Sequence, residues 1–310
     1  MIIGIHHIGL STPDPERSKA FYQQAFGLTL AAEGRISASG DLGRTMGVRD
    51  SALVTLIRAP NGYLEIIPTD LKVTTTERPV NEAGVRHFCV QNQVATPLVE
   101  GVVRAGGYLH AEPVDLGTGR DYAYARDVHG EVIEIESAPN AEESWPAWLG
   151  HAALVTHDID FLLEFYTDLL EREVKSRGRF GPAPAFDAVS GLKGVKVEGA
   201  WIDVDNMLLE IWRYESPATQ ARSALPAFSE PGFNHICFET DDIELFARRA
   251  TALGVNPLYF AESTSDQSGI FLGRDPDGNF LEGLEPRGVM ETLSLMEMPH
   301  RDILRKADGR

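Results

Sequence analysis

GIHHIGL, residues 4–10, begins a pattern that occurs four times in the chain and decides its fold. Each copy is a short apolar strand that carries one histidine, and the copies are GIHHIGL at 4–10, VRHFCV at 85–90, LGHAALV at 149–155 and FNHICF at 233–238. A stretch with helical spacing of apolar residues follows each copy, and Asp or Thr residues mark its start. Four such segments predict a fold built from repeated modules.

Each module closes with a second apolar strand, and that strand carries a glutamate. The four closing strands are NGYLEIIP at 61–68, HGEVIEIES at 129–137, DNMLLEIWRY at 205–214 and DGNFLEGLEP at 277–286. The histidine-to-glutamate interval is 58 residues in the first module and 59 in the third, and it is 47 in both the second and the fourth. Modules 1 and 2 therefore look duplicated as modules 3 and 4.

The alternation of side chains along a strand places these histidines and glutamates on the faces that their own helices do not cover. Two imidazole nitrogens and two carboxylates suit a divalent metal of intermediate hardness, such as Zn, Mn, Fe, Co or Ni. Four protein ligands on an octahedral ion leave two positions, which a substrate with two adjacent oxygens could occupy. The candidate metal ligands are His7, Glu65, His87 and Glu134 in the first half and His151, Glu210, His235 and Glu282 in the second.

Composition narrows the class of protein further. The 310 residues suggest about two domains, and the formal net charge of -18 argues against a nucleic-acid partner. The sequence has no apolar run of membrane-spanning length, and its first residues resemble a strand and not a signal peptide, so we expect a cytoplasmic protein. Two cysteines, Cys89 and Cys237, are too few for a disulfide framework.

Two motifs carry a resemblance to a known family. A histidine strand leads to an Asp seven residues later and to a helix with Phe-Tyr, and the pattern D-P-D-G-x(3)-E closes the last module at 275–282. These motifs resemble modules of the vicinal-oxygen-chelate superfamily, which contains glyoxalases, bleomycin-resistance proteins and extradiol dioxygenases. The stretches before Glu65 and Glu210 are similar to methylmalonyl-CoA-epimerase-like members.

The resemblance implies an α+β fold of four βαβββ modules that form two paired, cupped barrels. We expect an N-terminal domain of modules 1 and 2 at 1–137, a linker at 138–147 and a C-terminal domain of modules 3 and 4 at 148–286. Residues 287–310 form a C-terminal tail outside the resemblance. The family's ligand positions correspond to the eight candidate residues, with one metal site in each half.

The resemblance leaves three functions open. The first is a metal-dependent isomerase, epimerase or lyase that works through an enolate, with Glu65 or Glu210 as the catalytic base. The second is an Fe(II) extradiol ring-cleavage dioxygenase with His151, His235 and Glu282 as ligands, although Leu272 stands where that family's motif has Tyr. The third is a non-catalytic resistance-type protein that binds a small molecule.

The sequence says less about the substrate and about partners. The expected partner is a small molecule with adjacent oxygens, and side chains such as Trp201 and Trp212 could line a pocket for an aromatic or anionic compound. A fused four-module chain supplies its own module pairs, so a homo-oligomer is left open but is not required. His6 has no counterpart in the repeat and is therefore not expected to be a ligand.

Overall fold

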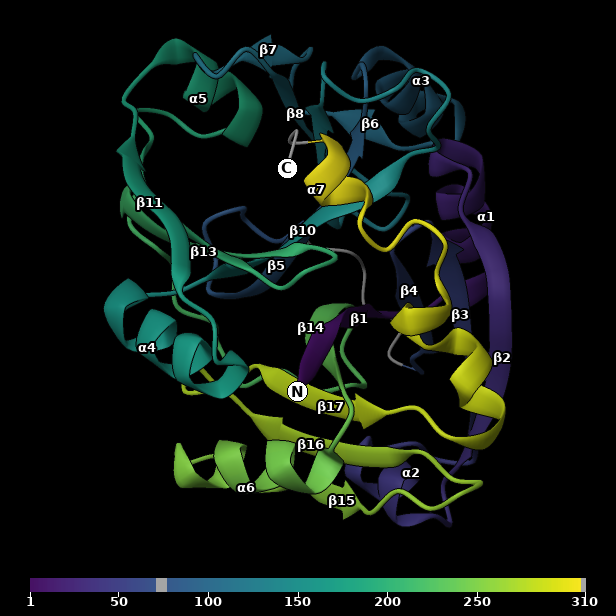
Figure 1. Cartoon of the computed structure of the whole chain (residues 1–310). Helices are drawn as coiled ribbons and strands as arrows, with labels where there is room; N and C mark the ends of the chain where they lie inside the picture. Colours follow the sequence, from purple (N-terminus) through teal and green to yellow (C-terminus); the bar gives the residue numbers. More distant parts are fainter. Residues whose placement is uncertain (71–76, 308–310) are drawn as a thin grey trace.

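A computed structural model describes residues 1–70 and 77–307, and Figure 1 shows how their helices and strands are arranged. The first half of the chain contains two modules. Module 1 comprises β1 (Ile2–Thr12), α1 (Pro15–Phe26), β2 (Thr29–Ser37), α2 (Asp41–Thr45), β3 (Ser51–Ala59) and β4 (Gly62–Pro68). Module 2 comprises β5 (Gly84–Asn92), α3 (Thr96–Arg104), β6 (Tyr108–Leu109), β7 (Val114–Asp115), β8 (Asp121–Arg126) and β9 (Val132–Ser137).

The second half repeats this order and ends in a helical tail. Module 3 comprises β10 (Trp148–Val155), α4 (Ile159–Leu170), β11 (Val174–Phe180), α5 (Pro184–Ser190), β12 (Lys196–Asp203) and β13 (Leu208–Ser216). Module 4 comprises β14 (Gly232–Thr240), α6 (Ile243–Ala252), β15 (Tyr259–Ala261), β16 (Gly269–Arg274) and β17 (Phe280–Glu285). The tail holds the 3-10 helices η1 (Gly288–Leu293) and η2 (Leu295–Glu297) and the helix α7 (Ile303–Ala307).

The strands form two curved sheets, and each sheet joins one module from each half of the chain. One sheet has the order β15-β16-β17-β14-β1-β4-β3-β2, so it pairs module 4 with module 1. The other runs β11-β12-β13-β10-β5-β9-β8-β6 and pairs module 3 with module 2. The predicted α+β fold of four modules in two cupped barrels is confirmed, but the predicted pairing of modules 1 with 2 and 3 with 4 is wrong.

Contacts between the two modules of one half do exist, but they are made by helices and turns. Helix α1 packs on α3, and α4 packs on α6, at opposite sides of the molecule in Figure 1. The hydroxyl of Tyr22 in α1 donates to Asp127 in the turn before β9, and Tyr166 in α4 donates to Asp275 in the turn before β17. The Phe-Tyr and D-P-D-G motifs thus supply structural contacts between modules that are consecutive in sequence.

Two buried asparagines link the two sheets reciprocally. Asn61, in the β3–β4 turn, donates to the carbonyls of Leu149 and Asn206, and its side-chain oxygen accepts from the Leu149 amide. Asn206, in the β12–β13 turn, makes the matching bonds to the backbone of Ile5 and to the carbonyl of Asn61. Both side chains are fully buried, so these bonds satisfy backbone groups that water cannot reach.

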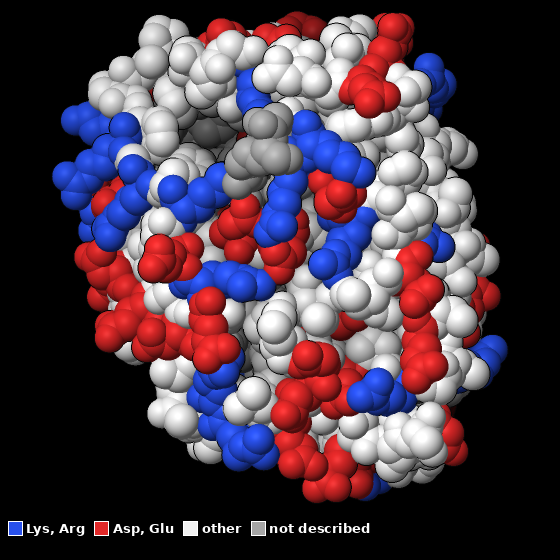
Figure 2. All heavy atoms as spheres, in the orientation of Figure 1, with Lys and Arg blue, Asp and Glu red and all other residues white. Residues whose placement is uncertain are grey.

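The tail crosses the molecule from one sheet to the other (Figure 1). Leu295 and Met298 pack with Tyr63 near module 1, whereas Ile303 packs with Trp148 on β10. None of the helices in the described ranges is long and apolar enough to cross a membrane. On the face that Figure 2 shows, Lys and Arg gather mainly across the upper part, with Asp and Glu among them and below.

Replacing Asn61 should destabilise the protein far more than replacing an exposed asparagine. In Asn61→Ala the buried Leu149 amide and carbonyl lose their partners, and each unsatisfied buried group costs about 1–3 kcal/mol. We expect the free energy of unfolding, measured by urea titration, to fall by about 3 kcal/mol. Asn256→Ala, at an exposed position, is the control and should change it by less than about 0.5 kcal/mol. Equal effects of the two substitutions would contradict a structural role for the Asn61 bonds.

Candidate metal centres

The strand register brings four candidate ligands together from modules 1 and 4. We call His7, Glu65, His235 and Glu282 centre A; they lie on the adjacent strands β4, β1, β14 and β17. Gly9 on β1 stands opposite both Glu65 and His235. A Cβ at Gly9 would lie 1.8 Å from the His235 ring, so only glycine lets that imidazole lie across β1.

The donor atoms of centre A lie close to one another across the two histidines. The Nε2 atoms of His7 and His235 are 3.0 Å apart. The Oε2 atom of Glu65 is 3.7 Å from His7 Nε2 and 3.4 Å from His235 Nε2. The Oε2 atom of Glu282 is 3.5 Å and 3.3 Å from the same two nitrogens.

Modules 2 and 3 assemble an equivalent cluster in the other sheet. We call His87, Glu134, His151 and Glu210 centre B; they lie on β5, β9, β10 and β13. The Oε2 atom of Glu134 is 3.0 Å from His87 Nε2 and 3.2 Å from His151 Nε2. The Oε2 atom of Glu210 is 3.2 Å from both nitrogens, which are 3.4 Å from each other.

All eight predicted residues therefore lie in two four-residue clusters, but the predicted division between them is wrong. His7 and Glu65 lie with His235 and Glu282, not with His87 and Glu134, because β1 pairs with β14. His87 and Glu134 lie with His151 and Glu210, because β5 pairs with β10. The three-residue set considered for a dioxygenase is also divided, since His151 belongs to centre B whereas His235 and Glu282 belong to centre A.

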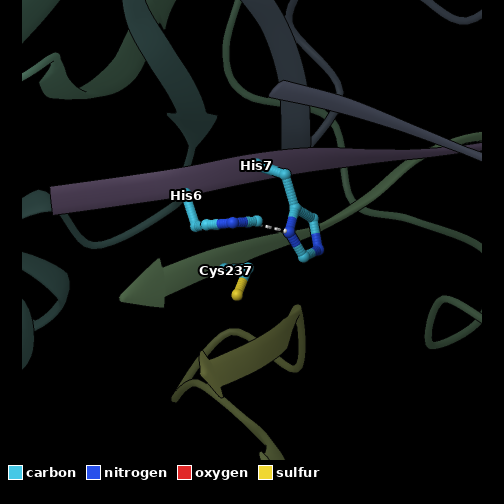
Figure 3. Close-up of side chains that lie close together, drawn as sticks. All are labelled: His6, His7 and Cys237. Atoms are coloured by element: carbon cyan, nitrogen blue, oxygen red, sulfur yellow. Dashed lines mark hydrogen bonds between the residues drawn. The ribbon is translucent and has the colours of Figure 1, made fainter. Parts of the chain in front are cut away.

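A hydrogen-bond relay fixes the tautomer of His7 at centre A. His6 Nε2 lies 3.1 Å from the carbonyl oxygen of Leu293 in the tail, and a carbonyl can only accept, so His6 Nε2 carries the proton. His6 Nδ1 then accepts from His7 Nδ1 at 2.8 Å, the contact drawn as a dashed line in Figure 3. Burial, and to a lesser extent the neighbouring His7, lowers the pKa of His6 to about 3, so its ring is neutral. The lone pair of His7 Nε2 consequently faces centre A.

A second relay does the same for His235. Ser11 donates to the carbonyl of Phe228, and the Asn234 side-chain amide donates to the Ser11 hydroxyl. The Asn234 side-chain oxygen therefore faces His235 and accepts from its Nδ1 at 2.6 Å. At centre B the positions before the histidines are Arg86, whose guanidinium contacts Pro79 and Glu82, and Gly150, which has no side chain.

These relays make a cation a good fit for centre A. Two neutral imidazoles that both carry their proton on Nδ1 present lone pairs to each other across 3.0 Å, and only a proton or a cation between them relieves the repulsion. Neighbouring ligand atoms about 2.1 Å from one metal ion lie roughly 3.0–3.5 Å apart, and most of the donor distances at both centres fall in this range. At centre B, the buried Glu210 Oε2 lies 3.2 Å from both imidazole nitrogens, as expected of an atom that shares a cation with them.

Without a metal, protons take its place. Burial alone would lower the pKa of both His151 and His235, but the adjacent glutamates outweigh it and raise each pKa to about 9. Burial would raise the pKa of Glu134, but His151 and His87 lower it to about 2. A divalent ion must therefore displace protons from the histidines when it binds.

Each centre opens into its own cavity. The cavity at centre A holds about 430 Å³ and includes the side chains of Glu65 and Glu282. The cavity at centre B holds about 390 Å³ and includes Glu134, His151 and Glu210. The tail contributes to both walls, with Leu293 at centre A and Leu304 at centre B.

Sequence reasoning missed His6 and Asn234 because the repeat has no counterpart for them. Each stands directly before a ligand histidine, and this adjacency was the only available signal. Cys89 and Cys237, which each follow a ligand histidine by two residues, are fully buried, and burial raises the pKa of both thiols well above its ordinary value.

Comparison with known proteins places the chain in a family. The sequence profile of the Glyoxalase/Bleomycin resistance protein/Dioxygenase superfamily matches residues 4–135 and 148–282. The chain belongs to this superfamily. No curated protein matches the sequence.

Two solved structures illustrate the likeness in fold. Glyoxalase I from Zea mays superimposes with a TM-score of 0.64 at 17% identity, over 96% of this chain and 96% of that one. A putative dioxygenase from Bacillus subtilis gives a TM-score of 0.63 at 14% identity, over 99% of this chain and 96% of that one. At these identities the likeness establishes the fold and leaves the reaction to the site.

Metal content of paired variants should reveal which histidines share a centre. If both centres load, His7→Ala and His235→Ala should each reduce the metal content from two ions per chain to one, because each removes a ligand of centre A. The double variant with both substitutions should still hold one ion, whereas His7→Ala combined with His87→Ala should hold none. Elemental analysis after dialysis measures the metal content. If the variant lacking His7 and His235 held no metal and the variant lacking His7 and His87 held one ion, the ligands of each centre would come from one half of the chain.

Removing His6 should weaken metal binding at centre A alone. His6→Ala frees the His7 ring to rotate and to change tautomer, and loss of such a supporting partner typically reduces metal affinity about 10–100-fold. The measurement is a zinc titration in a His87→Ala background, where centre A is tested by itself. His300→Ala, at an exposed position of the tail, is the control. An unchanged zinc affinity in His6→Ala would show that the relay does not support the ligand.

Proposed function

We propose that the protein is a divalent-metal-dependent enzyme that acts on small molecules with two adjacent oxygens, as an isomerase, epimerase or lyase. The observation that carries this proposal is the set of two histidines and two glutamates at each centre. At centre B all four donor atoms lie within 4.8 Å of one another, and at centre A both glutamates lie within 3.7 Å of the His7 and His235 nitrogens. Zn, Mn, Fe, Co and Ni all suit such a set. A bound ion of this kind would polarise the substrate's carbonyl and stabilise negative charge on its oxygen.

The side chains around each centre supply the remaining requirements of proton removal next to a carbonyl. Glu65 is the base we assign at centre A, because its side chain is 16% exposed, lines the cavity and can meet a substrate there; Glu282 shares this exposure and lining. Glu210 is the equivalent residue at centre B, but its side chain is only 3% exposed, and its Oε1 accepts from the indole of Trp201. Centre A is thus better arranged for proton transfer by its glutamate than centre B.

Two other functions make different demands on the same residues. A ring-cleaving dioxygenase binds both catechol and oxygen and typically uses three protein ligands, whereas each centre here offers four. Tyr124 favours this alternative at centre B, since it occupies the place of the dioxygenase motif's tyrosine and its ring centroid lies 5.1 Å from that of His87. A non-catalytic binding protein would require neither a metal nor Glu65.

Hydrogen exchange with solvent tests the proposed reaction. The zinc-, manganese-, cobalt- and nickel-loaded protein is incubated in D2O with small α-hydroxyketones and 2-substituted acyl compounds, and NMR follows deuterium incorporation next to the carbonyl. We expect Glu65→Gln to slow incorporation by about 10²–10⁴-fold, because the amide cannot accept the proton. Glu33→Gln, which alters another carboxylate of the same cavity, should keep the rate.

The other outcomes separate the alternatives. Exchange that survives both Glu65→Gln and Glu210→Gln would contradict the assignment of a glutamate base. Oxygen consumption with catechols by the iron-loaded protein would establish the dioxygenase. Ligand binding that is unaffected by complete removal of metal would establish the non-catalytic binding protein.

A further inference from the structure

The two centres have equivalent ligands, but the residues paired with their glutamates differ in kind. At centre B, Trp201 on β12 stands opposite Glu210, and Tyr124 on β8 stands opposite Glu134. At centre A, the positions opposite the corresponding Glu65 and Glu282 hold Leu56 and Leu272. Because the register is the same in the two sheets, each aromatic side chain at centre B replaces a leucine at centre A.

A third position follows the same rule. Two residues after the module's glutamate, centre B has Trp212 where centre A has Ile67. Trp212 stands opposite Gly199, and a Cβ there would lie 2.6 Å from the indole ring. The equivalent position in module 1, two residues before Leu56, is Val54. The space for the Trp212 ring therefore depends on a glycine that centre A lacks.

The aromatic side chains of centre B form a continuous wall that begins at the ligands themselves. The indole nitrogen of Trp201 donates to Glu210 Oε1 at 2.7 Å, which fixes the ring beside the centre. Ring centroids of Trp201 and Trp212 are 5.4 Å apart, and Phe180 lies 5.9 Å from the first and 5.8 Å from the second. All three rings line the cavity of centre B, so a molecule bound there can contact them.

The carboxylate of the centre B cavity that is not a ligand has a positive partner within the same cavity. Glu136, the further carboxylate in its wall, pairs with Arg120 at 2.8 Å and accepts from Gln91. A ligand that carries its negative charge on the two chelating oxygens, with an otherwise apolar body, suits these surroundings. The cavity of centre A has mainly aliphatic walls, supplied by residues such as Ile36, Val54 and Leu284, with the aromatic ring of Phe228 5.4 Å from that of His235.

We propose that the two centres take different substrates, and that centre B binds a planar aromatic ring bearing two adjacent oxygens. Centre A takes an aliphatic compound with the same chelating group. The inference rests on the proposed metal binding, because the metal holds the two oxygens in both cases. Flat rings gain from offset or edge-on contact with Trp201, Trp212 and Phe180, whereas a flexible aliphatic chain packs as well against leucine and isoleucine.

A matched pair of hydroxamates tests this proposal, because the two probes share one chelating group and differ only in the attached body. Benzohydroxamate and butyrohydroxamate are titrated by calorimetry into the zinc-loaded full chain. His7→Ala leaves centre B to be measured, and His87→Ala leaves centre A. At centre B we expect benzohydroxamate to bind about tenfold more tightly than butyrohydroxamate. At centre A we expect no preference for the aromatic probe.

Substitution of the wall identifies the cause of any preference. In the His7→Ala background, Trp212→Leu should remove the preference for benzohydroxamate and leave zinc content unchanged, since the Trp212 indole nitrogen makes no hydrogen bond to a ligand atom. Trp201→Phe keeps an aromatic ring and should retain most of the preference. Leu245→Ala, at an exposed position on α6, is the control.

The possible results separate this inference from the proposed function. If zinc binds at both centres but each centre binds the two probes equally tightly, the proposed difference in substrate class is overturned. The proposed metal-dependent function would stand. A preference at centre B that survives Trp212→Leu and is also seen at centre A would overturn it as well. Zinc at neither centre would overturn the proposed function and this inference with it.

Discussion

The pairing of β1 with β14 and of β5 with β10 is the constraint on which both centres depend. Each pairing places a histidine from one half of the chain beside a histidine from the other, and the flanking parallel strands add the two glutamates. Because a strand alternates its side chains, a shift of one residue in either register would move a histidine to the opposite face and dismantle a centre. The geometry of the sites is therefore a property of the whole chain and not of either half.

The exchange of modules between halves has physical support outside the sheets. Helix packing and the Tyr22–Asp127 and Tyr166–Asp275 bonds hold sequence neighbours together, while Asn61 and Asn206 join the two sheets at their turns. One apolar core runs through all four modules, so neither sheet is an independent unit. A molecule tied together in this way can keep eight ionisable side chains, six of them buried, at fixed distances.

Much of this arrangement could be predicted from the sequence, because intervals report a repeat directly. The equal spacings identified the modules and the eight residues of the two centres. The spacings could not identify which modules pair, because the first strand of a module can pair with the first strand of any other module and keep the same side-chain alternation. His6 and Asn61 act through hydrogen bonds to segments distant in sequence, and spacing carries no information about those partners.

The likeness between the centres is also incomplete, and the difference has chemical consequences. Centre A has tautomer relays through His6 and Asn234 and a partly exposed Glu65, whereas centre B has its glutamate held by Trp201 and an aromatic wall. Duplication supplied equivalent ligand positions, and the residues beside them diverged. One chain thus presents two chelating centres with different surroundings.

The location of bound metal in crystals of the zinc-loaded protein, by anomalous diffraction at the zinc edge, tests both centres most directly. We predict two peaks, one between the Nε2 atoms of His7 and His235 and the other between those of His87 and His151. A peak shared by His7 and His87, or by His151 and His235, would contradict the assembly of each centre from both halves. The absence of any peak at these histidines would contradict the assignment of metal centres altogether.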